Sequence, residues 1–416
     1  MVNGRSHFDY LETRDPEQRE LALFNMLPSL LARAIEKAPG WANHLRDVDV
    51  EHVTSRNALA RLPVMRKFLL KDMQAANLPL GGFQTADFRL LNRVFMSPGP
   101  IFEPEGRGAN WWRSARALFS AGFREDDIIM NTFAYHLTPG AWIVDSGARE
   151  LGCTVIPAGP DNTKQHLEVI ALLKPTAYVG VPDYLRTLLD MATVSGKDTS
   201  SLKRALVSGG TLLPALRKEY LDRKISVFQF YATADAGMIA YESDALEGMI
   251  VDEGVLLEIV RPGSGDPLPP GEVGEVLVTT FNRDYPMIRL ATGDLSAILP
   301  GVSSCGRTNT RIKGWMGRVD QVVKVKGVLI HPQQIAKMTE TFPQLGRLRL
   351  VIGRDGKQDM MVLKVEALNH EQQLAERIAS MLEELTGIIG AVQLVPPKTL
   401  PNDGRIIDDE RAQDIL

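Results

Sequence analysis

Residues 127–235 alternate between short apolar segments and amphipathic segments, and this alternation constrains the fold more than any other feature of the chain. Strands are predicted at 127–133, 153–156, 177–181, 206–209 and 225–230, and helices at 141–151, 166–173, 184–193 and 214–221. Alternation with short loops is typical of a parallel sheet covered by helices. Ligands of such sheets bind at the carboxyl ends of the strands. We therefore expect a site in the loops at 133–140, 157–160, 180–183, 208–211 and 231–235.

The chain has 416 residues, which is too long for one compact core. Short strands with Gly/Pro turns at about 250–300 indicate a β-rich subdomain, and a strand at 348–352 with a helix ending at Gly387 indicates a compact α+β unit. The predicted fold class is α/β. Residues 1–319 are expected to form a large N-terminal domain, with parallel sheets covered by helices plus the β-rich subdomain, and residues 320–416 a small mobile α+β domain. Near the N-terminus, Asp15 is expected to cap a helix that Pro16 opens, and Pro28 to kink or split it.

Composition and charge exclude several classes of function. The net charge is -4 and the basic residues form no block, which argues against a nucleic-acid partner. No apolar run approaches the roughly 18 residues of a membrane span, and the polar N-terminus is no secretory signal. The two cysteines lack CxxC spacing, which argues against a disulfide or a zinc site. The expected compartment is the cytoplasm, and a homodimer is compatible with the sequence.

Four stretches carry residues suited to nucleotide chemistry. Ser97 lies in SPGP, where a hydroxyl and backbone N–H groups can hold phosphate oxygens, and Asp235 follows a strand in FYATADAG, where a carboxylate can bind magnesium. Asp294 in YPMIRLATGD can accept both hydroxyls of a ribose, and Arg318 and Asp320 in GRVDQVVKVKG lie where a hinge is expected. Taken singly, each stretch has an ordinary alternative, which is a turn, a helix cap or a charged surface loop.

In this order and spacing the four stretches resemble the adenylate-forming superfamily of acyl-CoA synthetases. ETRDPEQRE, LPVMRK, TGD and GRVDQVVKVKG resemble its phenylacetate–CoA ligase branch, and the resemblance covers nearly the whole chain. It implies an enzyme that adenylates an aromatic, phenylacetate-like carboxylic acid with loss of pyrophosphate and then transfers the acyl group to CoA. The cofactors that it implies are ATP, Mg²⁺ and CoA.

The resemblance also implies roles for individual residues. Asp235 matches the acidic residue that holds magnesium and phosphate, and Asp294 matches the ribose-binding aspartate. Tyr231 is expected to stack on or flank the adenine, and Asp320 to be the hinge of the small domain. Further nucleotide contacts are expected of Ser97, Ser208, Gly209, Gly210, Ala232, Thr233, Arg318 and Lys326.

Three departures from the family pattern concern positions that contact phosphate. The loop SPGPIFEPE contains prolines, which lack an N–H, and two glutamates, which repel phosphate. Ala234 stands where the family has Thr or Ser. Gly404-Arg405 aligns with a Gly-Lys pair whose lysine bridges the substrate carboxylate and the phosphate. Arg405 and Asp235 are therefore expected to be catalytic. Arginine keeps the positive charge of the family's lysine but lacks its compact ammonium group. The alternative is that Arg405 is an exposed surface residue.

The acid is expected beside aromatic and apolar residues at the strand ends, although such residues are often simple core. The expected pocket residues are Phe133, Tyr135, His136, Tyr178, Val181 and Pro182. Three functions are compatible with these features: an acid–CoA ligase, an adenylating enzyme with another acceptor, and an adenylate-binding homologue with lost or altered catalysis. Release of pyrophosphate that depends on an added acid separates the active enzymes from the homologue.

Overall fold

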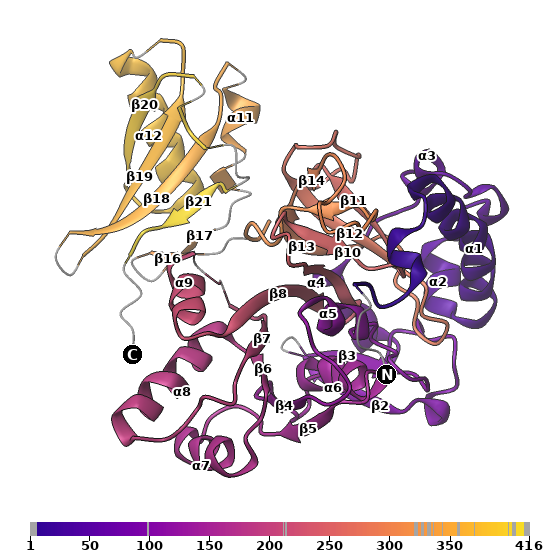
Figure 1. Cartoon of the computed structure of the whole chain (residues 1–416). Coiled ribbons are helices and arrows are strands. Elements are labelled where there is room, and N and C mark those ends of the chain that lie inside the picture. Colours follow the sequence, from indigo (N-terminus) through magenta and orange to yellow (C-terminus); the bar gives the residue numbers. More distant parts are fainter. Residues whose placement is uncertain are drawn as a thin grey trace.

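The computed structural model describes residues 6–97, 100–210, 212, 214–319, 323–325, 328–330, 334–335, 337–342, 344–355, 358–369, 371–397, 399–401 and 405–411. Figure 1 shows a large α/β body and, at the upper left in orange and yellow, a smaller unit built from the C-terminal residues. The mixed α/β fold class predicted from the alternation is confirmed.

A nine-stranded sheet lies at the centre of the large body, in the order β14-β15-β10-β9-β8-β7-β6-β4-β5. Its parallel half consists of β4 (Ile128–Asn131), β5 (Thr154–Pro157), β6 (Ala177–Gly180), β7 (Arg204–Val207) and β8 (Ser226–Thr233). The intervening helices are α6 (Gly140–Glu150), α7 (Thr163–Leu173), α8 (Pro182–Ser195) and α9 (Pro214–Asp222). The antiparallel half consists of β9 (Gly237–Glu242), β10 (Met249–Val251), β14 (Ile298–Leu299) and β15 (Arg311–Ile312). Every strand and helix predicted between residues 127 and 235 is therefore present.

A four-stranded sheet confirms the β-rich subdomain. Its order is β1-β13-β12-β11. The strands are β1 (Met65–Arg66), β11 (Val255–Val260), β12 (Gly274–Thr280) and β13 (Leu290–Ser296). All residues of β11 and β12 are buried, because apolar side chains of the N-terminal helices and of this sheet join in one core.

The N-terminal region is helical, and its first helix begins as predicted. The carboxylate of Asp15 accepts hydrogen bonds from the N–H groups of Glu17 and Gln18, and α1 (Pro16–Lys37) begins at the proline. The predicted split at Pro28 is wrong, because α1 continues through it. The missing hydrogen bond costs about 3 kcal/mol, which burial of the leucine-rich face of α1 offsets. The remaining elements are η1 (Tyr10–Thr13), α2 (Pro39–His44), η2 (Val50–His52), α3 (Arg56–Leu59), α4 (Lys67–Ala76), η3 (Phe88–Leu90), β2 (Arg93–Ser97), β3 (Ile101–Glu105) and α5 (Ala115–Ser120).

The C-terminal unit has its own apolar core, and all of its members among the described residues lie after residue 322. The helix predicted to end at Gly387 does so, because Gly387 has a φ of 71°, which favours glycine. The predicted boundary between residues 319 and 320 stays a prediction, since residues 320–322 lie outside the described part. The elements are β16 (Val323–Val325), β17 (Val328–Ile330), α11 (Met338–Thr341), β18 (Leu348–Asp355), β19 (Gln358–Glu366), α12 (Gln372–Thr386), β20 (Ala391–Val395) and β21 (Ile407–Asp409).

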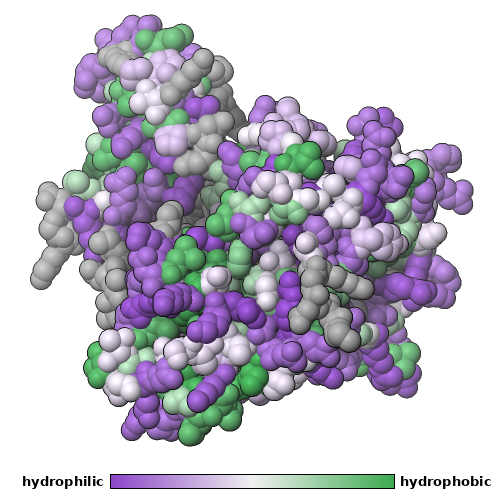
Figure 2. Space-filling model, viewed as in Figure 1, coloured by the Kyte–Doolittle hydropathy of each residue, from purple (hydrophilic) through white to green (hydrophobic). Residues whose placement is uncertain are grey.

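The surface in Figure 2 is mostly hydrophilic, with apolar side chains gathered at the lower edge, where α7 and α8 end. The exposed large apolar residues of these two helices are Leu172, Leu173, Met191 and Val194. A search of the described residues finds no helix with the length and apolar character needed to cross a membrane. Cys153 and Cys305 are both free thiols.

Candidate nucleotide and acid site

A cavity of about 510 Å³ lies at the carboxyl ends of β7 and β8, where the sequence predicts a ligand. It also receives residues from β13 and from the segment 313–318, so two sheets contribute to its wall. Seven residues predicted to contact the nucleotide line it: Ser208, Gly209, Gly210, Tyr231, Ala232, Asp294 and Arg318. The fold therefore brings together most of that predicted set.

Asp294 lies at the wall of this cavity with three hydrogen-bond donors around its carboxylate. Tyr231 donates its hydroxyl to Oδ2 at 2.8 Å, Trp315 donates Nε1 to Oδ1 at 3.0 Å, and Arg318 approaches Oδ1 at 3.4 Å. A carboxylate accepts about four hydrogen bonds. Arg318 makes the longest of the three contacts and its side chain is 47% exposed, so it is the donor that vicinal hydroxyls would displace most easily.

Tyr231 supports Asp294 from inside the protein. Only 7% of Tyr231 is exposed, and burial and the neighbouring Asp294 both raise the pKa of its phenol well above the usual value. The pairing of β8 with β9 shifts register between Tyr231 and Ala232, and both of these consecutive residues line the cavity. Such irregularities re-aim side chains next to functional sites. The predicted position of Tyr231 beside the adenine stays a prediction.

Gly209 connects the nucleotide cavity to the predicted acid pocket. Its φ of 74° is one that side chains rarely adopt. A Cβ atom at this position would lie 3.7 Å from Val181 and 3.8 Å from Phe133. Pro182 lies 3.4 Å from the position of a Cβ atom at the neighbouring Gly210. Three of the predicted pocket residues therefore adjoin the loop that lines the cavity.

The other predicted pocket residues lie elsewhere. Tyr178 is completely buried, and its hydroxyl donates to the carbonyl oxygen of Val181 at 3.0 Å, so it supports the loop from the core. Tyr135 accepts a hydrogen bond from Asn131 at 3.0 Å and packs edge-on against a tryptophan of α6. His136 is exposed. Their predicted contacts with the acid remain predictions.

A buried cluster of charges lies around Asp235. The ammonium of Lys67, at the start of α4, lies 2.5 Å from Oδ2 of Asp235, and the side chain of Lys67 is 27% exposed. Burial lowers the pKa of Lys67, but the carboxylates of Asp235, Glu103 and Asp294 outweigh that effect and raise it. Lys67 ends LPVMRK, a stretch to which the sequence assigned a family resemblance but no chemical role.

Ser97 and Glu103 complete this cluster from the β2–β3 hairpin. The hydroxyl of Ser97 donates to Oε2 of Glu103 at 3.0 Å, so it points into the hairpin's own carboxylate. Glu103 is 1% exposed, and burial and the charge of Asp235 raise its pKa to about 8. In the part of the chain that the structure describes, no group of three or more His, Cys, Asp and Glu side chains is arranged to hold a metal ion. A magnesium ion at Asp235 would therefore draw ligands from water and phosphate as well, as magnesium commonly does.

The remaining predicted residues lie outside the cavity wall. Arg405 is exposed, with a guanidinium 3.5 Å from Asp408. The hydroxyl of Thr233 accepts the N–H of Ala236 and so shapes the turn before β9. Asp320 and Lys326 lie outside the described residues.

The sequence missed several residues of the cavity wall. Trp315 donates a hydrogen bond to Asp294, and the one sequence signal that could have indicated this role is its position just before GRVD. Glu242 accepts Arg217 at 2.7 Å and the N–H of Gln229 at 2.7 Å, and both Gln229 and Glu242 line the cavity. These polar residues lie within apolar strands, where only the pairing of β8 with β9 brings them to the site.

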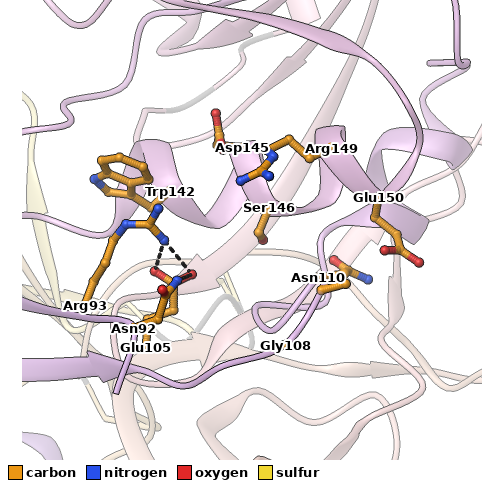
Figure 3. Close-up of a pocket in the computed structure, with 11 residues that line it drawn as sticks. Asn92, Arg93, Glu105, Gly108, Asn110, Trp142, Asp145, Ser146, Arg149 and Glu150 are labelled. Atoms are coloured by element: carbon orange, nitrogen blue, oxygen red, sulfur yellow. Dashed lines mark hydrogen bonds and ion pairs between the residues drawn. The ribbon is translucent and has the colours of Figure 1, made fainter. Parts of the chain in front are cut away.

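A second cavity, of about 390 Å³, lies beside α6 and the base of the β2–β3 hairpin (Figure 3). Here Arg93 lies over the ring of Trp142, 4.0 Å from its centre, and holds both carboxylate oxygens of Glu105 at 2.9 Å. Asp145 and Arg149 of α6 also line it. Its lining contains none of the predicted nucleotide-contacting residues, so the first cavity is the candidate site.

Comparison with known proteins agrees with this assignment. Residues 109–282 match the family model of AMP-binding enzymes, and residues 327–410 match that of the AMP-binding enzyme C-terminal domain. Phenylacetate-coenzyme A ligases of Thermus thermophilus and Escherichia coli are each 27% identical, covering 94% of this chain and 95% and 94% of their own lengths. A 2-hydroxyisobutyryl-CoA ligase solved in the postadenylation state with R3-HIB-AMP has the same fold, with a TM-score of 0.74, 23% identity, and coverage of 99% of this chain and 94% of its own. The chain therefore belongs to the AMP-binding enzyme family and is similar, over nearly its whole length, to phenylacetate-coenzyme A ligases.

Proposed function

We propose that the protein activates an aromatic, phenylacetate-like carboxylic acid with ATP and transfers the acyl group to CoA. A carboxylate oxygen of the acid attacks the α-phosphorus of ATP, and the bond to pyrophosphate breaks. The thiolate of CoA then attacks the acyl carbon, and AMP leaves. A carboxylate is a poor electrophile, and the mixed anhydride with AMP supplies the leaving group that it lacks.

The observation that carries this proposal is the cavity around Asp294. It combines a carboxylate for a ribose, glycines that allow close approach of a nucleotide, and Arg318 at its rim. The Lys67–Asp235 pair lies near enough that Asp294 contributes to the raised pKa of Lys67. Ribose and phosphate groups of one nucleotide fit that arrangement, in which fixed charges stabilise the charge that develops during transfer.

The acid class follows from the residues next to Gly209. Phe133, Val181 and Pro182 give that side an aromatic and aliphatic character, which suits an aryl acid. The names of the phenylacetate-coenzyme A ligases support the same class. A cytoplasmic location and a homodimer remain further predictions of this proposal.

Magnesium fits the cluster around Asp235, because Oδ1 of that buried carboxylate lacks a hydrogen-bond partner among the described residues, while Lys67 lies against Oδ2. When bound, it would neutralise phosphate charge. The residues of this chain would orient the nucleotide through Asp294 and exclude water through the buried setting of Asp235.

The proposal is tested by a screen for pyrophosphate release with aryl and aliphatic acids, with and without CoA. The expected result is release that requires an acid, highest with arylacetic acids, and formation of an acyl-CoA when CoA is present. Acid-dependent release without acyl-CoA would indicate another acceptor. No acid-dependent release with any acid would refute the proposal.

A second candidate is an adenylate-binding protein without turnover. The specific observation in its favour is Glu103, a carboxylate in a hairpin that the resemblance assigns to phosphate binding, with the Ser97 hydroxyl turned toward it. Tight binding of a non-hydrolysable acyl-adenylate analogue, together with no pyrophosphate release, would favour this candidate.

Arg405 yields a prediction about the adenylation step. Arg405→Ala should lower acid-dependent pyrophosphate release by about tenfold, the equivalent of one charge-assisted hydrogen bond of about 1.5 kcal/mol. Arg405→Lys should restore or raise it, because a lysine has the compact ammonium of the family. Thioester formation from pre-made adenylate serves as the control and should not change. If both variants release pyrophosphate like the wild type, Arg405 is a surface residue.

Asp320 yields a prediction about the hinge. Proline fixes φ near -65°, so Asp320→Pro should restrict rotation of the small domain. One half-reaction should then continue while the other slows by at least about tenfold, since each half-reaction requires its own domain arrangement. Single-turnover rates of adenylation and of thioester formation measure the two steps. Equal slowing of both, or of neither, would contradict the hinge role.

A further inference from the structure

The two cysteines of the chain lie in different surroundings. Cys153 is 8% exposed, its thiol donates to the carbonyl oxygen of Arg124 at 3.0 Å, and burial raises the pKa of that thiol to about 12. Cys305 is half-buried and lies in the loop between β14 and β15. It lines a cavity of about 550 Å³ that shares no lining residue with the candidate site. Because the thiolate is the reactive form of cysteine, these surroundings decide which of the two thiols can react.

Hydrogen-bond donors surround the thiol of Cys305. Burial raises its pKa, but the hydroxyls of Ser243 and Ser303 and the N–H groups of Arg307 outweigh burial and lower the pKa. Arg307 lines the same cavity and is 3% exposed. Its Nε donates to Glu12 at 2.7 Å, whereas its Nη2 is buried and has no hydrogen-bond partner among the described residues. A buried cation with an unused donor at the wall favours an anion in the cavity.

The rest of the cavity wall is basic. Arg124, Lys203 and Arg204 line it, together with one exposed carboxylate, that of Asp244. Arg204 has a carboxylate partner, whereas Arg124 donates to backbone carbonyls, and Lys203 forms no salt bridge with a described residue. Burial and the guanidinium groups of Arg204 and Arg307 lower the pKa of Arg124, because like charges repel. An anion in the cavity would relieve this repulsion.

We propose that Cys305 is a site of reversible modification by thiol–disulfide exchange with small disulfides that carry carboxylates, such as glutathione disulfide. The Cys305 thiolate attacks one sulfur of the disulfide. A bond forms between these two sulfurs, the original disulfide bond breaks, and the other half leaves as a thiolate with the electron pair. Cys305 is oxidised and the departing half is reduced, and an added thiol reverses the step. The basic wall holds the carboxylates of the attached half.

The test compares the two cysteines in the folded, full-length protein at about pH 7. The reagents are dithiobis(nitrobenzoate), which carries a carboxylate on each half, and dithiodipyridine, which is uncharged. Cys153→Ser keeps only Cys305 and should react with both reagents. Cys305→Ser keeps only Cys153 and should react at least about 100-fold more slowly, because a thiol with a pKa of about 12 forms almost no thiolate at this pH. Stopped-flow absorbance of the released thiolate gives the rate constants.

Charge variants in the Cys153→Ser background test the basic wall. Lys203→Gln should lower the rate constant with dithiobis(nitrobenzoate) at least about threefold and leave that with dithiodipyridine unchanged, since the lysine attracts only the anion. Lys197→Gln, which changes an exposed lysine outside the cavity, is the matched control and should react like its parent. Thermal melts show that each variant is folded.

Glutathione disulfide serves as the third reagent. Peptide mass spectrometry of the wild type should find one glutathione on Cys305 and none on Cys153, and dithiothreitol should remove it. Equal reactivity of the two cysteines in the folded protein would overturn the proposal. Rate constants of Lys203→Gln that match its parent with both reagents, or fall equally with both, would also overturn it. None of these measurements depends on the ligase activity.

Discussion

Asp294→Ala is expected to weaken ATP binding by roughly 10- to 150-fold, which is about 1.5–3 kcal/mol for each hydrogen bond lost from a charged group. The carboxylate lies at the wall of the nucleotide cavity, and its Oδ1 contacts the exposed side chain of Arg318 at 3.4 Å. A ribose hydroxyl that displaces this contact would gain one charge-assisted hydrogen bond, which Asp294→Ala removes. Isothermal titration calorimetry with ATP in the absence of acid measures the change.

Two further variants separate binding from folding. Asp294→Ala also removes the nearer of two acceptors of the buried Tyr231 hydroxyl, which keeps Thr292 Oγ1 at 3.1 Å, so stability should fall by only about 0.5–1.5 kcal/mol. Asp294→Asn keeps an oxygen for Tyr231 and should still weaken ATP binding. Trp315→Phe removes a donor but keeps the carboxylate, so its ATP affinity should stay within a few fold of the wild type. ATP affinity unchanged in both Asp294 variants would exclude the ribose role.

In metal-free buffer the free energy of unfolding is expected to fall by roughly 3–5 kcal/mol between about pH 5 and pH 8, owing to Glu103. In the unfolded chain this carboxyl loses its proton near its ordinary pKa of 4.5, whereas burial and Asp235 raise its pKa in the folded chain to about 8. Between these values the folded state binds one more proton than the unfolded state, so raising the pH favours unfolding. Each pH unit in that window costs about 1.4 kcal/mol.

Urea unfolding at about pH 5.5, 7 and 8.5 measures this slope. Glu103→Gln lacks the titrating group, so the difference between wild type and variant should grow as the pH rises, and the variant should be the more stable protein at pH 8.5. Glu105→Gln, which loses a paired carboxylate, should not show that gain. Parallel slopes for wild type and Glu103→Gln would mean that Glu103 titrates normally in the folded chain.

The sequence by itself determined the fold class and placed most of its predicted nucleotide contacts along the cavity, although other residues of the cavity wall were missed. The alternation of apolar and amphipathic segments predicted β4 to β8 and the helices between them. Buried residues recur with a different spacing in a helix than in a strand, so the sequence distinguishes the two. The parallel arrangement then placed Ser208–Gly210 and Tyr231 at one edge of the sheet, since strand ends meet there. The N-terminal cap at Asp15 and the C-terminal glycine of α12 were also predictable, because a cap depends on neighbouring residues alone.

Only the tertiary structure decided which charges face one another. Lys67 and Asp235 are 168 positions apart, and their ion pair depends on how α4 packs near the turn after β8. The hydrogen bonds that Tyr231 and Trp315 donate to Asp294 also depend on packing, because Tyr231 and Asp294 belong to two different sheets. Pro28 remained inside α1 because long-range burial outweighed a local preference. Hydrophobic periodicity is a local property of the chain, whereas the pairing of buried charges depends on distances between segments that only packing sets.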